Sequence, residues 1–429
     1  MKNNFEKYKN AVEYLESIVN LDQPDYMSLK RGRSLFLRRF EYFLKNLGNP
    51  QNSLKFIHVG GTSGKGSVAT MIQTILTEAK IKTGLYLSPH PTTTIERIKV
   101  NNLFIAPDEF ADLVEKIKPM IDKTYLNSPY GRPSYFEILT ALAFLYFKKQ
   151  KCEYAVLEVG LGGKYDATNI IKKAEATVIN KIGYDHEHIL GNSLEEIAKE
   201  KAGIIKPKTD FFTTEQNNKN VINIFEKICR KNKIKCNIVT KPEEKYKLKL
   251  LGKHQQQNAA LALAVTKKIG IKETKIKTGL NRVKMSCRTE IIQKNPLVIL
   301  DGAHNKSKMD STVRIIKNLT YKKLYLIIAL TNTRNPVEIF KKIKPSADYF
   351  FVTRYQSTER KCYSPKELAK KLKLKKTVEI YLDSQMALEK ALKLANKDDL
   401  ILVTGSFFLA GELRKNWRSE EDILKERII

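Results

Sequence analysis

Residues 60–67, with the sequence GGTSGKGS, have the composition of a loop that binds phosphate groups. Glycines let the backbone turn so that several N–H groups point inward, and a helix beginning just after the loop adds a partial positive charge. Lys65 is placed to reach the outer phosphates, and the Ser67 hydroxyl to contact Mg²⁺ or a phosphate. Gly66 separates these two residues, which departs from the usual Walker motif. The alternative is a plain glycine-rich turn, which leaves Lys65 and Ser67 without a role.

Three further polar segments contain residues suited to metal or phosphate chemistry: Ser88 in LSPH, Glu158 in EVGLGG, and Asp185 with His186 in YDHEHILG. Glu158 interrupts an apolar strand, where a buried charge is costly unless it is paired or binds a metal. Mg²⁺ prefers carboxylates and waters, and imidazole is a less usual ligand for it. By residue type alone, His186 is therefore equally well a capping or core histidine.

Two later positions are open to a chemical and to an ordinary interpretation. Asp301 ends an apolar strand in LDGAHN, with His304 close behind, and the alternative is an Asp-Gly turn without a chemical role. Lys201 lies in a glutamate-rich helix, where the ordinary interpretation is a surface lysine paired with a nearby glutamate.

Alternating apolar strands and helices must position these residues. An apolar run at residues 56–59 leads into the glycine loop, and helical spacing follows at 68–79. A nearly all-apolar helix at 136–149 should be buried against a sheet. Further strands are predicted at 82–88, 154–159 and 177–182. This pattern indicates a mostly parallel sheet, whose ligands bind beyond the carboxyl ends of the strands, where the polar segments fall.

A second alternation of strands and helices follows a break in composition at residues 294–296. It predicts a smaller α/β domain of about five strands. Residues 211–247 are rich in lysine and asparagine and show no clear pattern.

The length and composition of the chain limit the classes of protein to which it can belong. A length of 429 residues suggests two or three domains, and no apolar run is long enough to predict a membrane span. The polar N-terminus lacks the features of a secretory signal, and five scattered cysteines without CxxC pairs favour reduced thiols over a zinc site. The net charge of +31 raises the question of nucleic acid. Because the lysines are spread along the chain without aromatic-interleaved basic motifs, anionic small-molecule substrates are the favoured explanation.

Several longer motifs occur in one order: GTSGKGS, LSPH followed by ERI, SYFEILTALAF, EVGLGGKYDATN, YDHEHILGNSLEEIAKEKAGI, QNAALAL, CRTE, LDGAHN and VTGSFFLAGE. In these motifs the sequence resembles the folylpolyglutamate synthases and dihydrofolate synthases, relatives of the Mur ligases. The resemblance implies an α/β fold, with an N-terminal P-loop (Mur-ligase-like) ATPase domain built on a parallel sheet and a smaller C-terminal Rossmann-like domain. We expect these domains at residues 1–290 and 296–429, with a linker at 287–296.

The resemblance also assigns roles to individual residues. The expected triphosphate and nucleotide contacts are Thr62, Ser63, Gly64, Lys65, Gly66, Ser67, Asn258, Arg288 and Asp301. The expected magnesium ligands are Ser88, Glu158 and His186. The expected pterin-side residues are Ser134, Tyr135, Phe136, Glu137, Lys164, Tyr165 and Asp166. Catalytic roles fall to Lys65, Lys201 and His304, and Lys201 matches a lysine that the family carbamylates to make a further magnesium-binding carboxylate.

The implied activity is ATP-dependent ligation of L-glutamate to a folate-type carboxylate, either dihydropteroate or a reduced folate, through an acyl phosphate. The expected cofactors are ATP and Mg²⁺, with K⁺ as an additional candidate. We expect a cytoplasmic monomer that binds neither membranes nor specific nucleic acid. A Mur-type ligase with another amino acid and acceptor is the alternative. A nucleic-acid-associated ATPase is a weaker one, suggested only by charge.

The departures from the family pattern lie mainly on the pterin side. Lys164 and Tyr165 stand where the family has arginine and leucine. In the segment resembling LGLER, Phe36 replaces a glycine and Arg38 an acidic residue. A positive charge there favours an acceptor with more carboxylates, such as a folate that already carries glutamate. The alternative is a shifted segment with a pocket rebuilt from other side chains.

Overall fold

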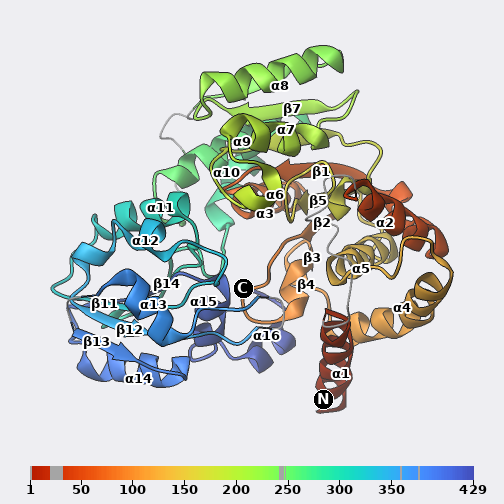
Figure 1. Cartoon of the computed structure of the whole chain (residues 1–429). Helices are drawn as coiled ribbons and strands as arrows, with labels where there is room; N and C mark the ends of the chain where they lie inside the picture. The colour runs from red at the N-terminus through yellow and green to blue at the C-terminus, as the bar shows by residue number, and fades with distance from the viewer. Residues whose placement is uncertain (1, 20–31, 241–245, 247, 358–359, 375–376) are drawn as a thin grey trace.

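The computed structural model of the chain describes residues 2–19, 32–240, 246, 248–357, 360–374 and 377–429. Two α/β units, each built on its own sheet, lie side by side (Figure 1). The α-helices are α1 Lys2–Val19, α2 Ser34–Asn46, α3 Lys65–Glu78, α4 Pro107–Asn127, α5 Tyr135–Lys149, α6 Glu187–Leu190, α7 Leu194–Lys201, α8 Lys219–Lys231, α9 His254–Lys268, α10 Glu273–Arg282, α11 Lys306–Ile316, α12 Pro336–Phe340, α13 Pro365–Leu372, α14 Ser384–Leu394, α15 Phe407–Arg414 and α16 Glu420–Glu426. Short 3₁₀ turns are η1 Pro50–Ser53, η2 Thr94–Arg97, η3 Ala167–Ile170, η4 Ala202–Ile204 and η5 Lys344–Ser346. Among the described residues, no helix is long and apolar enough to span a bilayer.

The first sheet has eight strands in the order β4-β3-β2-β5-β1-β6-β7-β8. They are β1 Lys55–Gly60, β2 Thr83–Tyr86, β3 Ile98–Val100, β4 Leu103–Phe104, β5 Tyr154–Glu158, β6 Ala176–Ile179, β7 Asp210–Thr214 and β8 Cys236–Val239. All pairings are parallel except those of β3 with β2 and with β4 at one edge. The central strand β1 is buried from Phe56 onward because helices cover both faces of the sheet.

Side chains that alternate along the strands feed two cores on opposite faces of this sheet. Phe56 and Tyr86 pack with α1, α2, α4 and α5, whereas Ile57 and Leu85 pack with α3, α9 and α10. Residues 211–247, which showed no pattern in the sequence, contain β7, α8 and β8. Helix α8 is strongly amphipathic and buries Val221, Phe225 and Cys229 on one face, but its remaining positions include lysines and asparagines, so the composition of the segment concealed the helix.

The second sheet has six strands in the order β13-β12-β11-β14-β10-β9. They are β9 Glu290–Lys294, β10 Leu297–Leu300, β11 Leu324–Ile328, β12 Tyr349–Val352, β13 Thr377–Ile380 and β14 Leu400–Thr404. Only β9 runs antiparallel to its neighbour β10. Asn295 and Pro296, which we expected in a linker, form the turn between these two strands, because turn chemistry marks a hairpin as readily as a domain boundary. The division into residues 1–290 and 296–429 stays a prediction.

The last helix, α16, returns to the first unit. Ile423 and Leu424 are buried in the same core as α1, α4 and α5. Backbone and side-chain hydrogen bonds link Arg427 to Phe104, at 2.8 Å from Phe104 N to Arg427 O and 2.9 Å from Arg427 Nε to Phe104 O. In Figure 1 the C-terminus accordingly lies next to β4, between the two sheets. The C-terminal segment therefore packs on the first unit, although it follows the strands of the second.

A buried ion pair fixes α2 against α5. Arg39 is 3% exposed and Glu137 is 3% exposed, and Arg39 donates to both carboxylate oxygens of Glu137 at 2.9 and 3.0 Å. Glu137 also accepts from the backbone N–H of Ser134 at 2.8 Å, which completes a capping box at the start of α5. Each charge is thus neutralised by the other in a dry interior, where losing one partner is expensive.

We predict that Arg39→Met destabilises the protein by about 3–5 kcal/mol, because it leaves the Glu137 carboxylate buried and unpaired. The neighbouring Arg38 is exposed, so Arg38→Met is the matched control and should change stability by less than about 0.5 kcal/mol. The measurement is the urea midpoint of the unfolding transition. Replacing both partners, as in Arg39→Met with Glu137→Leu, should recover most of the loss. Equal midpoints for the two single variants would contradict the role of the pair.

Candidate active site

The glycine loop connects β1 to α3 in the arrangement that the sequence predicts. Gly64 is the N-cap of α3 and has a left-handed backbone with φ of 77°. A Cβ atom at this position would lie 2.4 Å from Asn180 Nδ2 and 2.5 Å from Asn258 Oδ1, so only glycine fits. Asn180 donates to Asn258 at 2.7 Å, and this pair of amides supports the loop from behind. The first turn of α3 therefore presents its free N–H groups to the space in front of the loop.

A cavity of about 140 Å³ lies between this loop and the second unit. Every residue predicted to contact the triphosphate or the nucleotide lines it: Thr62, Ser63, Gly64, Lys65, Gly66, Ser67, Asn258, Arg288 and Asp301. The same cavity is lined by Glu158 and by residues that the sequence reasoning missed, among them Asn180, Lys308 and Arg314. The structure thus brings these residues together from both units, and several of them are cationic, as a polyphosphate ligand requires.

The Asp301 carboxylate accepts four hydrogen bonds that hold the backbone beside this cavity in place. It accepts from Thr289 N at 2.8 Å, Thr289 Oγ1 at 3.1 Å, Ala303 N at 3.1 Å and Thr312 Oγ1 at 2.7 Å. These bonds hold the turn that carries Arg288, whose guanidinium lies 4.7 Å from the centroid of the Phe407 ring. Asp301 is therefore more than an Asp-Gly turn, because it fixes the position of a cation in the cavity.

The structure brings two of the three predicted magnesium ligands together. Ser88 N donates to Glu158 Oε2 at 3.1 Å, and Glu158 is 4% exposed. A Cβ on Gly66 would lie 3.3 Å from Glu158 Oε1, so the carboxylate rests on the first turn of α3. No ion pair to Glu158 is present among the described residues. A buried carboxylate with so little compensation fits a divalent cation.

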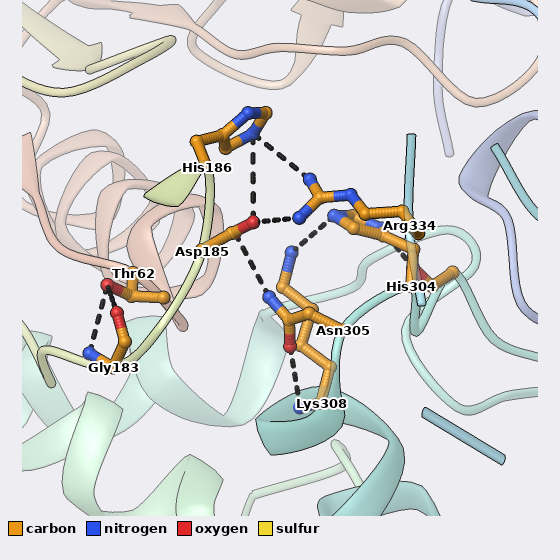
Figure 2. Close-up of polar contacts among 9 residues, drawn as sticks. Thr62, Gly183, Asp185, His186, His304, Asn305, Lys308 and Arg334 are labelled. Atoms are coloured by element: carbon orange, nitrogen blue, oxygen red, sulfur yellow. Dashed lines mark hydrogen bonds and ion pairs between the residues drawn. The ribbon is translucent and has the colours of Figure 1, made fainter. Parts of the chain in front are cut away.

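His186 does not join this pair. Its Nε2 atom lies 3.0 Å from an Arg334 NH2 group, and Arg334 also pairs with the adjacent Asp185 (Figure 2). Asn305 donates to the other Asp185 oxygen at 3.1 Å, so this cluster links the two units. Burial lowers the pKa of His186 to about 3, which keeps the imidazole neutral and able to accept a hydrogen bond. In this arrangement the His186 lone pair is used by Arg334 and is not free for a metal.

His304 lies beside the cavity and orients Lys308. The His304 Nδ1 atom is 2.8 Å from Gly302 O, and a carbonyl can only accept, so Nδ1 carries the proton. Nε2 then accepts from Lys308 Nζ at 3.0 Å (Figure 2). Burial, with the charges of Arg288 and Lys65, lowers the pKa of Lys308 to about 7. A sequence signal for Lys308 existed: Asn305 caps α11 and accepts from Lys308 N, which puts Lys308 in the first turn of that helix.

Lys201 is the last residue of α7 and is 4% exposed, so it is not a surface lysine. The loop before Lys164 crosses its backbone, since a Cβ on Gly163 would lie 2.6 Å from Lys201 O. Burial and the nearby Lys65 lower the pKa of Lys201 to about 7, while Asp185, Asp166 and Glu200 oppose the shift. A substantial fraction of this amine is therefore neutral near pH 7.

The pterin-side residues fall into two neighbouring segments. Ser134 to Glu137 form the capped start of α5, and Phe136 packs over Gly160, where a Cβ would lie 2.6 Å from Phe136 Cζ. Asp166 accepts from Leu161 N at 2.8 Å and Thr168 N at 2.9 Å, and burial raises its pKa. The carboxylates of Glu137 and Asp166 are thus occupied by protein groups. The remaining members are Tyr135, which is buried, Tyr165, which is partly exposed, and Lys164, which is exposed.

Comparison with known proteins matches residues 59–240 to the Mur ligase middle domain and residues 287–407 to the Mur ligase glutamate ligase domain. The dihydrofolate synthase/folylpolyglutamate synthase of Bacillus subtilis (strain 168) is 29% identical, over 90% of this chain and 96% of that protein. The structure of folylpolyglutamate synthase from Thermotoga maritima superimposes with a TM-score of 0.80 at 31% identity, covering 95% of this chain and 97% of that one.

This chain belongs to the folylpolyglutamate synthase/dihydrofolate synthase family. A folylpolyglutamate synthase of Mycobacterium tuberculosis solved with ADP superimposes with a TM-score of 0.86 at 25% identity, covering 96% of this chain and 99% of that one. The family fold of two α/β units, one with a P-loop, is confirmed. The residues of the candidate site that the motifs did not indicate include Asn180, Lys308 and Arg314 at the cavity and Arg334 beside His186.

We predict that Lys308→Met weakens ATP binding about tenfold, or roughly 1.4 kcal/mol, because it removes a cation that faces the cavity. Lys306→Met, on the exposed side of the same helix turn, is the matched control and should leave ATP binding unchanged. Calorimetric titration with a non-hydrolysable ATP analogue measures both. An unchanged dissociation constant for the Lys308 variant would remove this residue from the nucleotide site.

Proposed function

We propose that this chain is an ATP-dependent ligase that joins L-glutamate to the carboxylate of a folate-type acceptor. The observation that carries the proposal is the cavity lined by Lys65 of the glycine loop, by Arg288 and Lys308 of the second unit, and by the Glu158 carboxylate. ADP bound to the Mycobacterium tuberculosis relative supports a nucleotide in this cavity. Membership of the family supports the acceptor class.

In the proposed reaction, a carboxylate oxygen of the acceptor attacks the γ-phosphorus of ATP, the bond to the bridging oxygen breaks, and ADP leaves. The amine of L-glutamate then attacks the acyl carbon, phosphate leaves, and the amine loses a proton. Lys65, Lys308 and the N-terminus of α3 stabilise the charge on the phosphoryl group as it moves. Glu158 with Ser88 and Ser67 would hold Mg²⁺, which when bound polarises the phosphoryl oxygens. A role for K⁺ rests on the family resemblance alone.

The acceptor is proposed to enter from the side of α5, where the partly exposed Phe136 and Tyr165 and the exposed Lys164 offer aromatic and cationic surface. Phe36 and Arg38, which replace a glycine and an acid of the family pattern, lie in α2. Arg38 is exposed, and the Arg39 guanidinium lies 5.2 Å from the centroid of the Phe36 ring. We propose that both dihydropteroate and reduced folates are accepted, and that extension of an existing glutamate tail is favoured.

The test is ADP release with purified enzyme, ATP, Mg²⁺ and L-glutamate, in the presence of either dihydropteroate or tetrahydrofolate. Turnover should require both the acceptor and glutamate, with kcat/KM higher for tetrahydrofolate. Lys65→Ala should lower turnover by roughly a hundredfold or more while the circular dichroism spectrum stays the same. Stimulation by another amino acid and acceptor would favour the Mur-type alternative. Stimulation by RNA or DNA alone would favour a nucleic-acid-associated ATPase.

We further propose that Lys201 is carbamylated: its neutral amine attacks CO₂, an N–C bond forms, and one proton is lost to give a carbamate anion. Burial and the pKa of about 7 support this, because only the neutral amine is a nucleophile. The carbamate should therefore form increasingly as pH rises through 7 and be lost below it. The measurement is a ¹³C carbamate resonance after incubation with ¹³C-bicarbonate.

The control for this measurement is Lys199→Ala, an exposed lysine of the same helix, which should keep both the resonance and the activity. Lys201→Ala should lose both. An active Lys201→Ala variant, or wild-type enzyme without a carbamate signal at pH 8, would leave Lys201 as a buried structural amine. We also propose a cytoplasmic location and a monomeric state, which only the family resemblance supports.

A further inference from the structure

A second, smaller cavity of about 50 Å³ adjoins the first. Gly66, Glu158 and Arg288 line both cavities. The lining of the second cavity combines Thr70 and Leu85, from the α3 side of the first sheet, with Phe104 and Ile429, which pack in the core on the α5 side. A molecule bound there would therefore lie next to the glycine loop and the Glu158 carboxylate.

Polar groups without partners line this second cavity. Thr70 Oγ1 and Ser286 Oγ are buried, and neither makes a hydrogen bond within the described part of the chain. Thr70 is 2% and Ser286 7% exposed. Buried hydroxyls in native proteins are almost always satisfied, so two of them at one cavity indicate a polar occupant.

Lys99 supplies a charge to the same cavity. It lies on β3, where its backbone is paired opposite Leu85 of β2 and Phe104 of β4, and like Glu158 it interrupts an apolar strand. No ion pair to Lys99 is present in the ranges that the structure describes. Burial lowers its pKa only to about 8, so the ammonium is mostly charged at pH 7. Lys99 is partly exposed, but its charge is poorly solvated in this place, so a nearby anion would stabilise it.

The other polar side chains that line the cavity indicate whether the bound molecule carries a negative or a positive charge. Lys284, which is exposed, and Arg288 add two positive charges, and the carboxylates are those of Glu96, Glu158 and the last residue, Ile429. Glu96 accepts from Thr92 N at 2.6 Å and Thr93 N at 2.8 Å, and burial raises its pKa to about 7, so it is only partly ionised near pH 7. The three cations Lys99, Lys284 and Arg288 therefore outnumber the carboxylates of Glu158 and Ile429, which favours an anion.

We propose that this cavity binds a carboxylate group of one of the two carboxylate substrates, with Lys99 as its counter-ion and Thr70 and Ser286 as hydrogen-bond donors. The assignment rests on the proposed ligase function. Leu85, Phe104 and Phe407 form apolar walls that suit the methylene groups next to such a carboxylate. The volume also has room for a few water molecules, but water alone does not neutralise the Lys99 charge.

The geometry matches either substrate. L-glutamate, held by one carboxylate in this cavity, would have its amine near Gly66 and Glu158, which also line the first cavity. An acceptor would instead place one of its carboxylates there. Both candidate ligands would bind through a carboxylate, and the KM values measured for each substrate distinguish them.

The test compares Lys99→Met, which keeps the bulk and removes the charge, with Lys123→Met, an exposed lysine of α4, as the matched control. KM is measured separately for ATP, L-glutamate and tetrahydrofolate. We expect Lys99→Met to raise KM about tenfold for one carboxylate substrate and to leave KM for ATP unchanged. Ser286→Ala should raise the same KM by a smaller factor without lowering the thermal midpoint, so the assignment remains testable if the lysine variant folds poorly.

A rise in KM for L-glutamate would assign the cavity to the amine donor, and a rise for tetrahydrofolate would assign it to the acceptor. Unchanged KM values for both, or equal changes in the control, would overturn the proposal and leave a water-filled cavity. If the wild-type enzyme shows no folate-dependent turnover, the proposed function fails. Calorimetry with L-glutamate and, separately, with tetrahydrofolate then tests the cavity alone: weaker binding of either one to Lys99→Met than to wild type would support it, and equal binding to both proteins, or no binding of either ligand, would overturn it.

Discussion

The first turn of α3 has no room for a side chain at Gly64 and little room for one at Gly66, and the candidate site depends on this constraint. Asn180 and Asn258 approach Gly64 from one side, and the Glu158 carboxylate approaches Gly66 from another. The helix can therefore place its free N–H groups between an amide pair and a buried acid. Any larger residue would separate the loop from β5 and from α9, and with them the groups that would contact a phosphate and a metal.

Charged side chains from both units lie around the first turn of α3. Arg288, Lys308 and Arg334 come from the second unit, whereas Glu158, Asp185 and Lys65 come from the first. Burial keeps His186 and His304 neutral, so each accepts a hydrogen bond from a cation of the second unit. The histidines thus position cations, and the cavity gains its positive character from residues that neither unit could assemble alone.

Local pattern explains why part of this was predictable. The glycine loop, Glu158 and Asp301 stand at the ends of apolar strands, and parallel pairing brings such ends to one edge of a sheet. The position of Arg334 could not be predicted in this way, because Arg334 lies in an irregular segment. Its contact with Asp185 depends on how the two units pack against each other. Lys201 appeared to be an ordinary surface lysine because helical spacing does not reveal what covers the helix. The hairpin at Asn295 and Pro296 looked like a linker for the same reason: turn residues say that the chain reverses, not what it joins.

The return of α16 gives the molecule a second crossing between its halves. The chain passes from the first unit to the second between α10 and β9, and it passes back before α16, whose Ile423 and Leu424 are buried against α1, α4 and α5. Two bodies joined at one point can tilt and swivel freely. Joined at two separate points, they can swing only about the line between them, so closure over a nucleotide would follow a single hinge axis set by the covalent path of the chain.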